Sequence, residues 1–383
     1  MVSQREVKDT GIIDEPQIFE LLEEARTASK EQALEIVEKA KSFSGLSLEE
    51  LAILLQSNAP EVREAIFETA RAVKERVYGT RMVFFAPLYV SNACVNNCLY
   101  CGFRKDNKEL KRRVLSMEEI EKEIKILLDQ GHKRILLVAG EHPKLNNIDY
   151  VVQAVNTIYQ TSSGNASIRR VNVNCAPLSI EEYRRLKESN IGTYQLFQET
   201  YHNETYRQMH PSGPKALYGW RIEAPSRAME AGIDDVGIGP LFGLFDWKFE
   251  VMATLMHAQY LDGKYGVGPH TISVPRLEPA LNAPVAMNPP FQITDDDMKM
   301  IVATLRLAVP YTGIILSTRE RPEFRDQLFA LGVSQTSAGS RTSPGGYSDA
   351  EAHKPDAEQF SIGDTRDLAE LTCQMCREGY IPS

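Results

Sequence analysis

The sequence lacks the features that mark membrane-bound and secreted proteins. It has no run of about 18 apolar residues and so predicts no membrane-spanning helix. Its first residues, MVSQREVKDTGIIDEPQ, contain no apolar stretch of the kind that forms a secretory signal peptide. Cysteine is scarce as well, and six residues in 383, three of them in one short stretch, do not form a disulfide framework. We therefore expect a cytoplasmic protein.

An excess of positive charge is also missing. The formal net charge is -9 and the isoelectric point is about 5.5, which argues against a general surface for nucleic acid or anionic membranes. We accordingly expect neither a nucleic-acid partner nor a membrane partner. The chain has an ordinary globular composition, with 43% hydrophobic and 25% charged residues. At 383 residues it can bury a sizeable core without disulfides.

The pattern of apolar residues changes once along the chain. Up to residue 80 it predicts only helices, as in EPQIFELLEEART and PEVREAIFETARAVKERVYG. Eight short β-branched or apolar runs then alternate with helical patterns, and they begin at Arg81, Arg134, Arg170, Thr193, Asp234, His270, Thr312 and Val333. This alternation predicts an α/β fold of the (β/α)8 TIM-barrel type. An open doubly wound sheet is the alternative, but no G-x-G-x-x-G follows a first strand.

We expect a helical extension at residues 1–80, the barrel at 81–345, and a linker with a final helix at 346–383. A polar residue stands near the carboxyl end of almost every predicted strand. In chain order these are Ser91, Glu141, Asn174, Glu199, Asp246, Arg276, Arg319 and Ser340. A single polar residue at a strand end is explained by exposure to solvent and needs no functional role. Eight on the face where barrel strand ends converge favour a large buried polar site.

The most specific motif is the stretch SNACVNNCLYCGF, which directly follows the first predicted strand. It holds Cys94, Cys98 and Cys101 in the spacing C-x3-C-x2-C. A zinc site needs a fourth cysteine or histidine, and none stands at the usual ligand spacing. A four-iron cluster also normally takes four cysteines, so three leave one iron open to bind a small molecule. Three unrelated cysteines are the plain alternative, but this spacing after a first barrel strand argues against it.

The stretch CVNNCLYC resembles the cluster loop of radical S-adenosylmethionine (SAM) enzymes, in which an aromatic residue, here Tyr100, precedes the third cysteine. The resemblance implies that the cysteines hold a [4Fe-4S] cluster and that S-adenosyl-L-methionine chelates its fourth iron. The run LLVAGEHP resembles the G-G-E element of that family, with Ala139 in place of the first glycine. By this resemblance Gly140 and Glu141 hold the methionine ammonium, for which an anionic or carbonyl acceptor is suitable.

Longer stretches resemble the aromatic amino acid lyases of this superfamily. They are PLYVSNACVNNCLYCGF, QETYHNETYRQMHP, MEAGIDDVGIG, LSTRE and SAGSRTSPGGYS. The implied reaction starts from a 5′-deoxyadenosyl radical and breaks the Cα–Cβ bond of L-tyrosine, which gives p-cresol and dehydroglycine. GPLFGLFDWKFEVMATLMHA and GPHTISVPRLEPALNAP are similar to members that serve [FeFe]-hydrogenase H-cluster maturation, where dehydroglycine is the precursor of CO and cyanide. A thiamine-pathway tyrosine lyase and a non-catalytic iron–sulfur scaffold are the alternatives.

The expected substrate residues are chosen for a zwitterion that carries a phenol. Arg319, at a strand end and in the matching LSTRE run, suits the tyrosine carboxylate because a guanidinium binds a carboxylate bidentately. Ser340 is expected to assist it. Further candidates around the substrate or SAM are Tyr89, Ser91, His270 and Arg276. For His270 the resemblance suggests a place near the substrate or a labile iron.

The expected SAM residues lie after the third and fourth barrel strands. Glu199 is an acid after the fourth predicted strand, and Arg221 stands on the following helix. The family pattern assigns both to polar groups of SAM. Asn172 and Asn174 are expected to meet the ribose, with the strand register deciding which of them faces inward. Tyr100 joins this set through the cluster motif.

The resemblance also implies a segment beyond GYIPS with its own C-x2-C and a later cysteine, where a second cluster converts dehydroglycine. This sequence stops at Ser383, so we expect p-cresol formation with poor conversion of dehydroglycine. Cys373 and Cys376 precede GYIPS within a helical pattern, and we expect two cysteines on one helix face. The implied partners are L-tyrosine, a reductant of the ferredoxin or flavodoxin type, and other hydrogenase maturation proteins.

Overall fold

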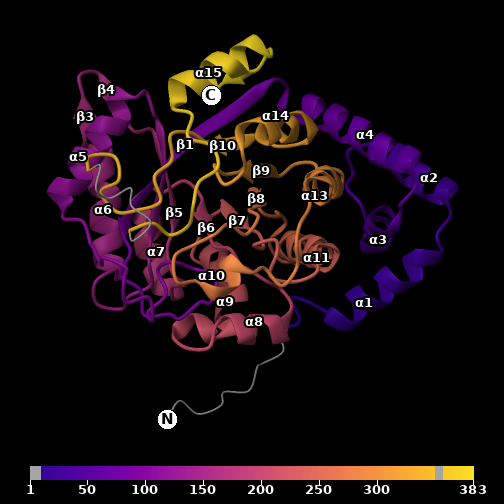
Figure 1. Ribbon diagram of the computed structural model, residues 1–383, viewed down its shortest axis with the longest axis horizontal. Coiled ribbons are helices and arrows are strands. Elements are labelled where there is room, and N and C mark those ends of the chain that lie inside the picture. Colours follow the sequence, from indigo (N-terminus) through magenta and orange to yellow (C-terminus); the bar gives the residue numbers. More distant parts are fainter. Residues whose placement is uncertain (1–9, 350–356) are drawn as a thin grey trace.

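Eight parallel strands close into a barrel in the computed structural model, which describes residues 10–349 and 357–383 (Figure 1). The barrel strands are β1 (Arg81–Ser91), β2 (Arg134–Ala139), β5 (Arg170–Asn174), β6 (Tyr194–Gln195), β7 (Val236–Ile238), β8 (Thr271–Ser273), β9 (Gly313–Leu316) and β10 (Gln335–Ser337). The barrel closes because β10 pairs with β1, with Val83 opposite Gln335. Each strand begins within two residues of its expected start. The predicted (β/α)8 barrel is therefore confirmed.

Helices cover the outside of this barrel (Figure 1). They are α5 (Met117–Asp129), α6 (Ile148–Gln160), α7 (Ile180–Glu188), α8 (Asn203–Met209), α9 (Tyr218–Ile222), α10 (Ala224–Glu230), α11 (Trp247–Tyr265), α13 (Asp295–Ala308) and α14 (Pro322–Leu331). The short helix α12 (Pro284–Met287) lies instead against the loop that follows β1, where Val285 N–H donates to the Leu99 carbonyl at 3.1 Å. Ser116 and Ser179 each form a capping box with the glutamate three residues on. The chain from Tyr218 to Glu230 is divided into α9 and α10, because Pro225 has no N–H to donate and stands in the first turn of α10.

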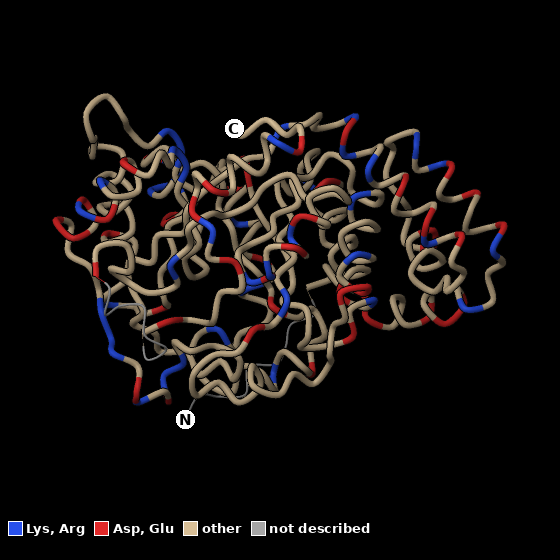
Figure 2. Tube along the Cα trace, turned by 45° about the horizontal axis from the view of Figure 1, so that its top comes forward, with Lys and Arg blue, Asp and Glu red and all other residues tan. Residues whose placement is uncertain are grey.

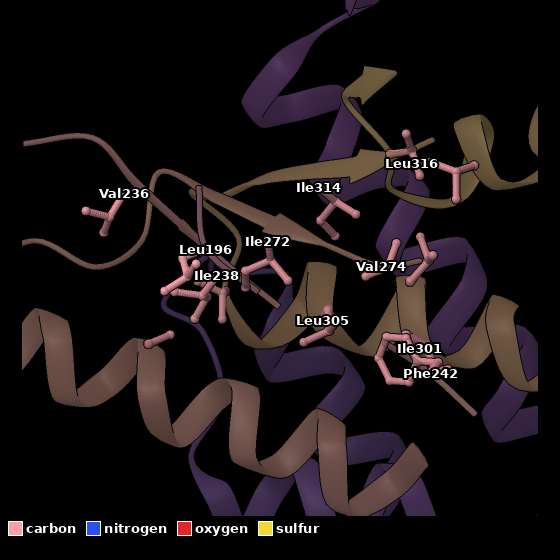
Figure 3. Packing of buried hydrophobic residues seen from close by; sticks show 14 of the residues in the cluster. Leu196, Val236, Ile238, Phe242, Ile272, Val274, Ile301, Leu305, Ile314 and Leu316 are labelled. Atoms are coloured by element: carbon pink, nitrogen blue, oxygen red, sulfur yellow. The ribbon is translucent and has the colours of Figure 1, made fainter. Parts of the chain in front are cut away.

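The side chains of each strand alternate between two buried layers, one beneath the surrounding helices and one inside the barrel. Ile272 of β8 and Ile314 of β9 are fully buried and lie in one cluster with Leu305 of α13, beneath the helices (Figure 3). Their neighbours Ser273 and Ile315 line a cavity inside the barrel instead. Successive side chains of a strand point to opposite faces, which explains this division. The barrel interior therefore remains available for a site.

Four helices precede the barrel and form a layer outside α11 and α13 (Figure 1). They are α1 (Glu15–Glu24), α2 (Lys30–Ala40), α3 (Leu48–Gln56) and α4 (Pro60–Tyr78), with a 3-10 turn, η1 (Ala25–Thr27), after α1. Ile18, Leu51 and Ile66 anchor this layer and are fully buried. Acidic and basic residues are interspersed along its helices (Figure 2). Among the described residues, no helix is both long enough and apolar enough to cross a membrane.

The chain beyond β10 returns to the barrel. Gln359 N–H donates to the Thr342 carbonyl at 3.0 Å, and Ser361 N–H donates to the Pro279 carbonyl at 2.9 Å. The remaining elements are α15 (Leu368–Arg377), β11 (Ile381–Pro382), which pairs in parallel with the start of β1, and a small outer hairpin of β3 (Ser162–Ser163) and β4 (Ala166–Ser167). The described part of the expected linker is thus irregular in structure but packed.

A buried arginine fastens this returning segment to the barrel. Arg325 of α14 is fully buried and forms an ion pair with the fully buried Asp364. Its guanidinium also donates to Thr336 Oγ1 and to the Ser337 carbonyl of β10, both at 2.6 Å. Arg366 contacts the same Asp364 carboxylate at 2.6 Å. A single side chain therefore joins α14, β10 and the returning segment.

We predict that Arg325→Leu lowers the free energy of unfolding by about 3–5 kcal/mol, because it removes the fully buried one of the two arginines that pair with Asp364 and leaves the Ser337 carbonyl without this donor. Urea unfolding followed by circular dichroism measures the loss. Lys125→Ala is the control, since it breaks only an exposed pair with Glu121 and costs less than about 0.5 kcal/mol. Equal losses in the two variants would contradict the assigned role of Arg325.

Candidate active site

The cluster loop, residues 92–103, begins at the carboxyl end of β1 and lies against the residues that come directly after β2. Val95 N–H donates to the Glu141 carbonyl at 2.8 Å. The Asn96 side chain joins two further groups, since its Nδ2 donates to the Glu141 carboxylate at 2.6 Å and its Oδ1 accepts from Lys215 N–H at 2.9 Å. The loop is therefore held by the barrel on both sides.

The three cysteines of the loop face a common space. Cys94, Cys98 and Cys101 all line one cavity of about 590 Å³. Among the described residues, no three His, Cys, Asp or Glu side chains converge closely enough to hold a single metal ion, which argues against mononuclear zinc. A [4Fe-4S] cluster does not need that convergence, because each thiolate binds a different iron. The arrangement fits such a cluster with one iron left without a protein ligand.

Burial controls the acidity of these thiols. It raises the pKa of Cys98 to about 12, and the nearby Lys215 ammonium opposes this shift only in part. Burial also raises the pKa of Cys101, and the neighbouring Cys94 adds to that shift. Both thiols are thus protonated at neutral pH before iron binds. Loading of a cluster releases these protons and becomes more favourable as the pH rises.

A buried acid with two cations separates the cysteine cavity from a second one. Glu199 accepts a hydrogen bond from Lys215 Nζ at 2.6 Å and lies 3.5 Å from the Arg221 guanidinium. Burial acts to raise the pKa of Glu199, but the two cations outweigh it and hold this pKa below its ordinary value. The residue has a φ of 74°, and its carbonyl accepts from Leu241 N–H at 2.7 Å. The carboxylate is therefore ionised and fixed in place.

The second cavity has a volume of about 1030 Å³. Its apolar lining includes Phe85, Tyr89, Leu136, Val138 and Ile315. Two cations line it as well, Lys215, which is paired with Glu199, and Arg319. The Arg319 guanidinium lies 3.4 Å from the ring centroid of Phe360 and donates a long hydrogen bond of 3.5 Å to the Arg276 carbonyl. No carboxylate in the described residues forms an ion pair with Arg319, and Ser340 Oγ has no hydrogen-bond partner there. The cavity thus offers a cation without a direct ion-pair partner in the described residues and a free hydroxyl beside aromatic walls.

Tyr100, the aromatic residue before the third cysteine, is fixed by a buried histidine. Its hydroxyl lies 2.7 Å from His210 Nε2, and His210 Nδ1 lies 2.7 Å from the Tyr206 carbonyl. A carbonyl only accepts, so Nδ1 carries the proton and Nε2 accepts from Tyr100. Burial holds the pKa of His210 well below its ordinary value, which preserves this neutral form. The tyrosine ring therefore has a single orientation, and it lines the aromatic cavity described above.

Known proteins match this chain over most of its length. The family model of the radical SAM superfamily matches residues 88–256, and that of the Biotin and Thiamin Synthesis associated domain matches residues 273–381. A crystal structure of HydG, a maturase of the [FeFe]-hydrogenase, has a TM-score of 0.93 and 51% identity, covering 97% of this chain and 80% of that chain. HydG from Carboxydothermus hydrogenoformans has a TM-score of 0.88 and 47% identity, covering 96% and 83%. The 2-iminoacetate synthase of Salmonella typhimurium is 34% identical, covering 90% of this chain and 89% of that protein.

This chain belongs to the radical SAM tyrosine lyase family. Its cofactors are accordingly a [4Fe-4S] cluster and SAM. The cysteine cavity also presents Glu141, Asn174, Glu199 and Arg221 beside the thiols. These groups supply both acceptors for an ammonium or hydroxyls and a donor for a carboxylate, which is the set that SAM requires. The residues present therefore fit both cofactors of a radical SAM lyase.

Two expected residues of this lyase do not line either cavity. Ser91 is buried, and its Oγ accepts from Ala93 N–H at 3.1 Å, so it shapes the start of the cluster loop instead of touching a ligand. Asn172 and Asn174 are two residues apart on β5, so both side chains point to the same face of the strand. The two residues differ in their height along the barrel axis, and the strand register does not distinguish them. Asn172 lies lower in the barrel and accepts from Thr193 N–H at 2.9 Å, while Asn174 lines both cavities.

Arg276 and His270 also lie outside the expected cavity. Arg276 is at the carboxyl end of β8, but its guanidinium binds Glu320 and Asp295, each at 3.0 Å, and is neutralised there. His270 precedes β8, at the barrel end away from the cysteines, with Nδ1 3.6 Å from Asp235. His270 therefore lies away from both cavities, because the two ends of a barrel strand face different sides of the protein. Its suggested place at a labile iron stays a prediction.

Sequence reasoning missed three contributors to the cavities, which are Lys215, Gln359 and Phe360. Lys215 stands in the 3-10 turn η2 (Pro214–Ala216), and the run HPSGPK, whose Gly213 has a φ of 98°, was the available signal of a tight turn near the site. Gln359 and Phe360 belong to the stretch expected to be a linker. Composition alone gives no signal that such a stretch returns to a barrel.

The two cysteines near the end of the chain lie apart from these cavities. Cys373 and Cys376 lie three residues apart on α15, and both are exposed. Neither lines the cysteine cavity or the aromatic cavity. Their position agrees with two cysteines on one helix face.

We predict that Gly140→Ala weakens retention of the cluster. A Cβ at this position would lie 2.5 Å from the Ala93 carbonyl oxygen and 3.3 Å from Cys94 Cβ, so the cluster loop must move. A cost of about 1–3 kcal/mol corresponds to roughly 5- to 150-fold faster loss of cluster absorbance in chelator, if the bound state alone is destabilised. Gly263→Ala is the control, since its Cβ would meet nothing within 4 Å. Unchanged retention in Gly140→Ala would show that this close approach does not position the loop.

Proposed function

We propose that the chain cleaves the Cα–Cβ bond of L-tyrosine and forms p-cresol and dehydroglycine. The observation that carries this proposal is that a cavity lined by three cysteines adjoins an aromatic-lined cavity whose arginine forms no ion pair in the described residues. When bound, the cluster and SAM supply the 5′-deoxyadenosyl radical that starts the reaction. The residues of the chain bind, orient and enclose the small molecules. Their arrangement suits a substrate with an aromatic ring at one end and a carboxylate at the other.

Arg319 is assigned to the carboxylate of tyrosine. Its guanidinium is partly buried, lies on the ring of Phe360 and forms no ion pair among the described residues, while Glu199 and Glu278 act on it only from a distance. An incoming carboxylate therefore supplies a direct partner for it. Ser340 Oγ is free to donate to the same ligand. Tyr89 contributes its ring to the wall, while its hydroxyl is already used in a hydrogen bond to Gln359 at 2.8 Å. The aromatic and aliphatic walls then enclose the phenol ring.

The SAM residues are assigned by charge and by place in the cysteine cavity. Glu141, next to Gly140, provides the acceptor for the methionine ammonium. Arg221 is the cation suited to the methionine carboxylate, and Asn174 and Glu199 are suited to the ribose hydroxyls. Since two cations balance Glu199, its carboxylate can accept hydrogen bonds without leaving an uncompensated negative charge. Tyr100 lines the neighbouring aromatic cavity.

The biological context that we infer is assembly of the [FeFe]-hydrogenase active site, with dehydroglycine as the precursor of CO and cyanide. It is supported by the 51% identity to HydG over 97% of the chain. Thiamine-pathway 2-iminoacetate formation is the second candidate, because a 2-iminoacetate synthase is 34% identical over 90% of the chain. Both candidates require the same cleavage of tyrosine. A reductant of the ferredoxin or flavodoxin type and other maturation proteins are the proposed partners.

We predict that anaerobically reconstituted protein with SAM, dithionite and L-tyrosine forms 5′-deoxyadenosine and p-cresol together. Liquid chromatography with mass spectrometry measures both products, and the assay without tyrosine is the control. A non-catalytic scaffold would form neither product. A radical SAM enzyme for another substrate would form 5′-deoxyadenosine without p-cresol, and either result would contradict the proposal.

We predict that Arg319→Met lowers kcat/KM for tyrosine about 10- to 150-fold, because it removes charged hydrogen bonds worth about 1.5–3 kcal/mol. Steady-state p-cresol formation measures this loss. Arg321→Met is the matched control, since Arg321 is two residues away, exposed, and forms an ion pair with Asp295 at the surface. SAM cleavage in the absence of tyrosine should remain unchanged in both variants. An unchanged kcat/KM in Arg319→Met would remove this residue from the substrate site.

A further inference from the structure

The strap, residues 357–361, lies over the cluster loop and is fixed there by backbone hydrogen bonds. The Gln359 carbonyl accepts from Gly102 N–H at 3.0 Å, and Gln359 N–H donates to the Thr342 carbonyl at 3.0 Å. The approach is close enough that a Cβ on Gly102 would lie 2.8 Å from the Gln359 carbonyl oxygen. The position of the Gln359 backbone is therefore set on both sides.

The Gln359 side chain connects the two cavities. Its Oε1 accepts from the Tyr89 hydroxyl at 2.8 Å, in the wall of the aromatic cavity. Its Nε2 lies 3.6 Å from Cys101 Sγ, as the donor of an N–H···S hydrogen bond. The opposite orientation of the amide would turn Oε1 toward the sulfur, and an iron-bound thiolate can only accept. The Tyr89 hydroxyl, by occupying Oε1, thus keeps the amide nitrogen directed at the sulfur.

We propose that Gln359 is a positioning residue that raises the reduction potential of the cluster through this N–H···S hydrogen bond. One-electron reduction adds a negative charge to the cluster and its thiolates. A donor at a cluster sulfur stabilises that charge more in the reduced state than in the oxidised state. Removal of the donor therefore makes the cluster harder to reduce. The proposal rests on the three-cysteine cluster site and does not depend on which amino acid is cleaved.

The test is a redox titration of the reconstituted holoprotein, with dithionite as reductant and electron paramagnetic resonance as the readout of the reduced cluster. Gln359→Leu removes the donor, and we expect its midpoint potential to be more negative than that of the wild type. Gln359→Glu keeps the length and the acceptor for Tyr89 but replaces the donor by a negative charge. Its midpoint potential should be more negative still. Ser361→Ala is the matched control in the strap, because Ser361 is exposed and its Oγ donates to the Pro279 carbonyl, away from both cavities.

Wild-type potentials in both Gln359 variants, at full iron content, would overturn the proposal. An equal shift in Ser361→Ala would also overturn it, since general loosening of the strap would then explain the result. If Gln359→Leu does not bind the cluster, the midpoint potential of the near-isosteric Gln359→Glu serves as the test. The titration contains no tyrosine, so a shifted potential together with absent p-cresol would uphold this inference while rejecting the proposed substrate.

Discussion

Closure of the sheet between β10 and β1 is the constraint on which the site depends. Pairing of these two strands, as at Val83 and Gln335, makes the first and last units of the barrel neighbours. The cluster loop leaves β1 at the same mouth where Ser340 follows β10. An open sheet of the same strands would put these segments at opposite edges, and the cysteines would then face solvent. The barrel thus supplies both the position of the thiols and the enclosure around them.

Buried charge is distributed unequally between the two cavities. Glu199 has two cations and is balanced within the protein, while Arg319 has a ring beneath it and no carboxylate partner in the described residues. Contact with Phe360 offsets part of the burial cost of that guanidinium, by about 0.5–2 kcal/mol. The rest of this burial cost is offset when an anionic group binds to the guanidinium. The cavity is therefore more stable with an anionic ligand bound than without one.

Local patterns predicted much of the fold and part of the site. Strand and helix periodicity gave the eight strands, and cysteine spacing with strand ends gave the cluster loop and Arg319. The same reasoning failed for Asn172, since alternation assigns a face but no height within the barrel. It failed for Arg276, since a strand end does not reveal which carboxylates surround it. Gln359 was out of reach because its contacts are with residues distant in the chain and its neighbours in sequence carry no periodic pattern.

The distance along the chain between the cluster loop and the strap has a consequence for biosynthesis. A nascent chain that has emerged only as far as β10 already contains all three cluster cysteines and every barrel strand. It still lacks the wall that Gln359 and Phe360 provide. During translation the thiols therefore pass through a stage in which they face an open mouth, accessible to iron–sulfur donors and to oxygen alike. Docking of the strap ends that stage.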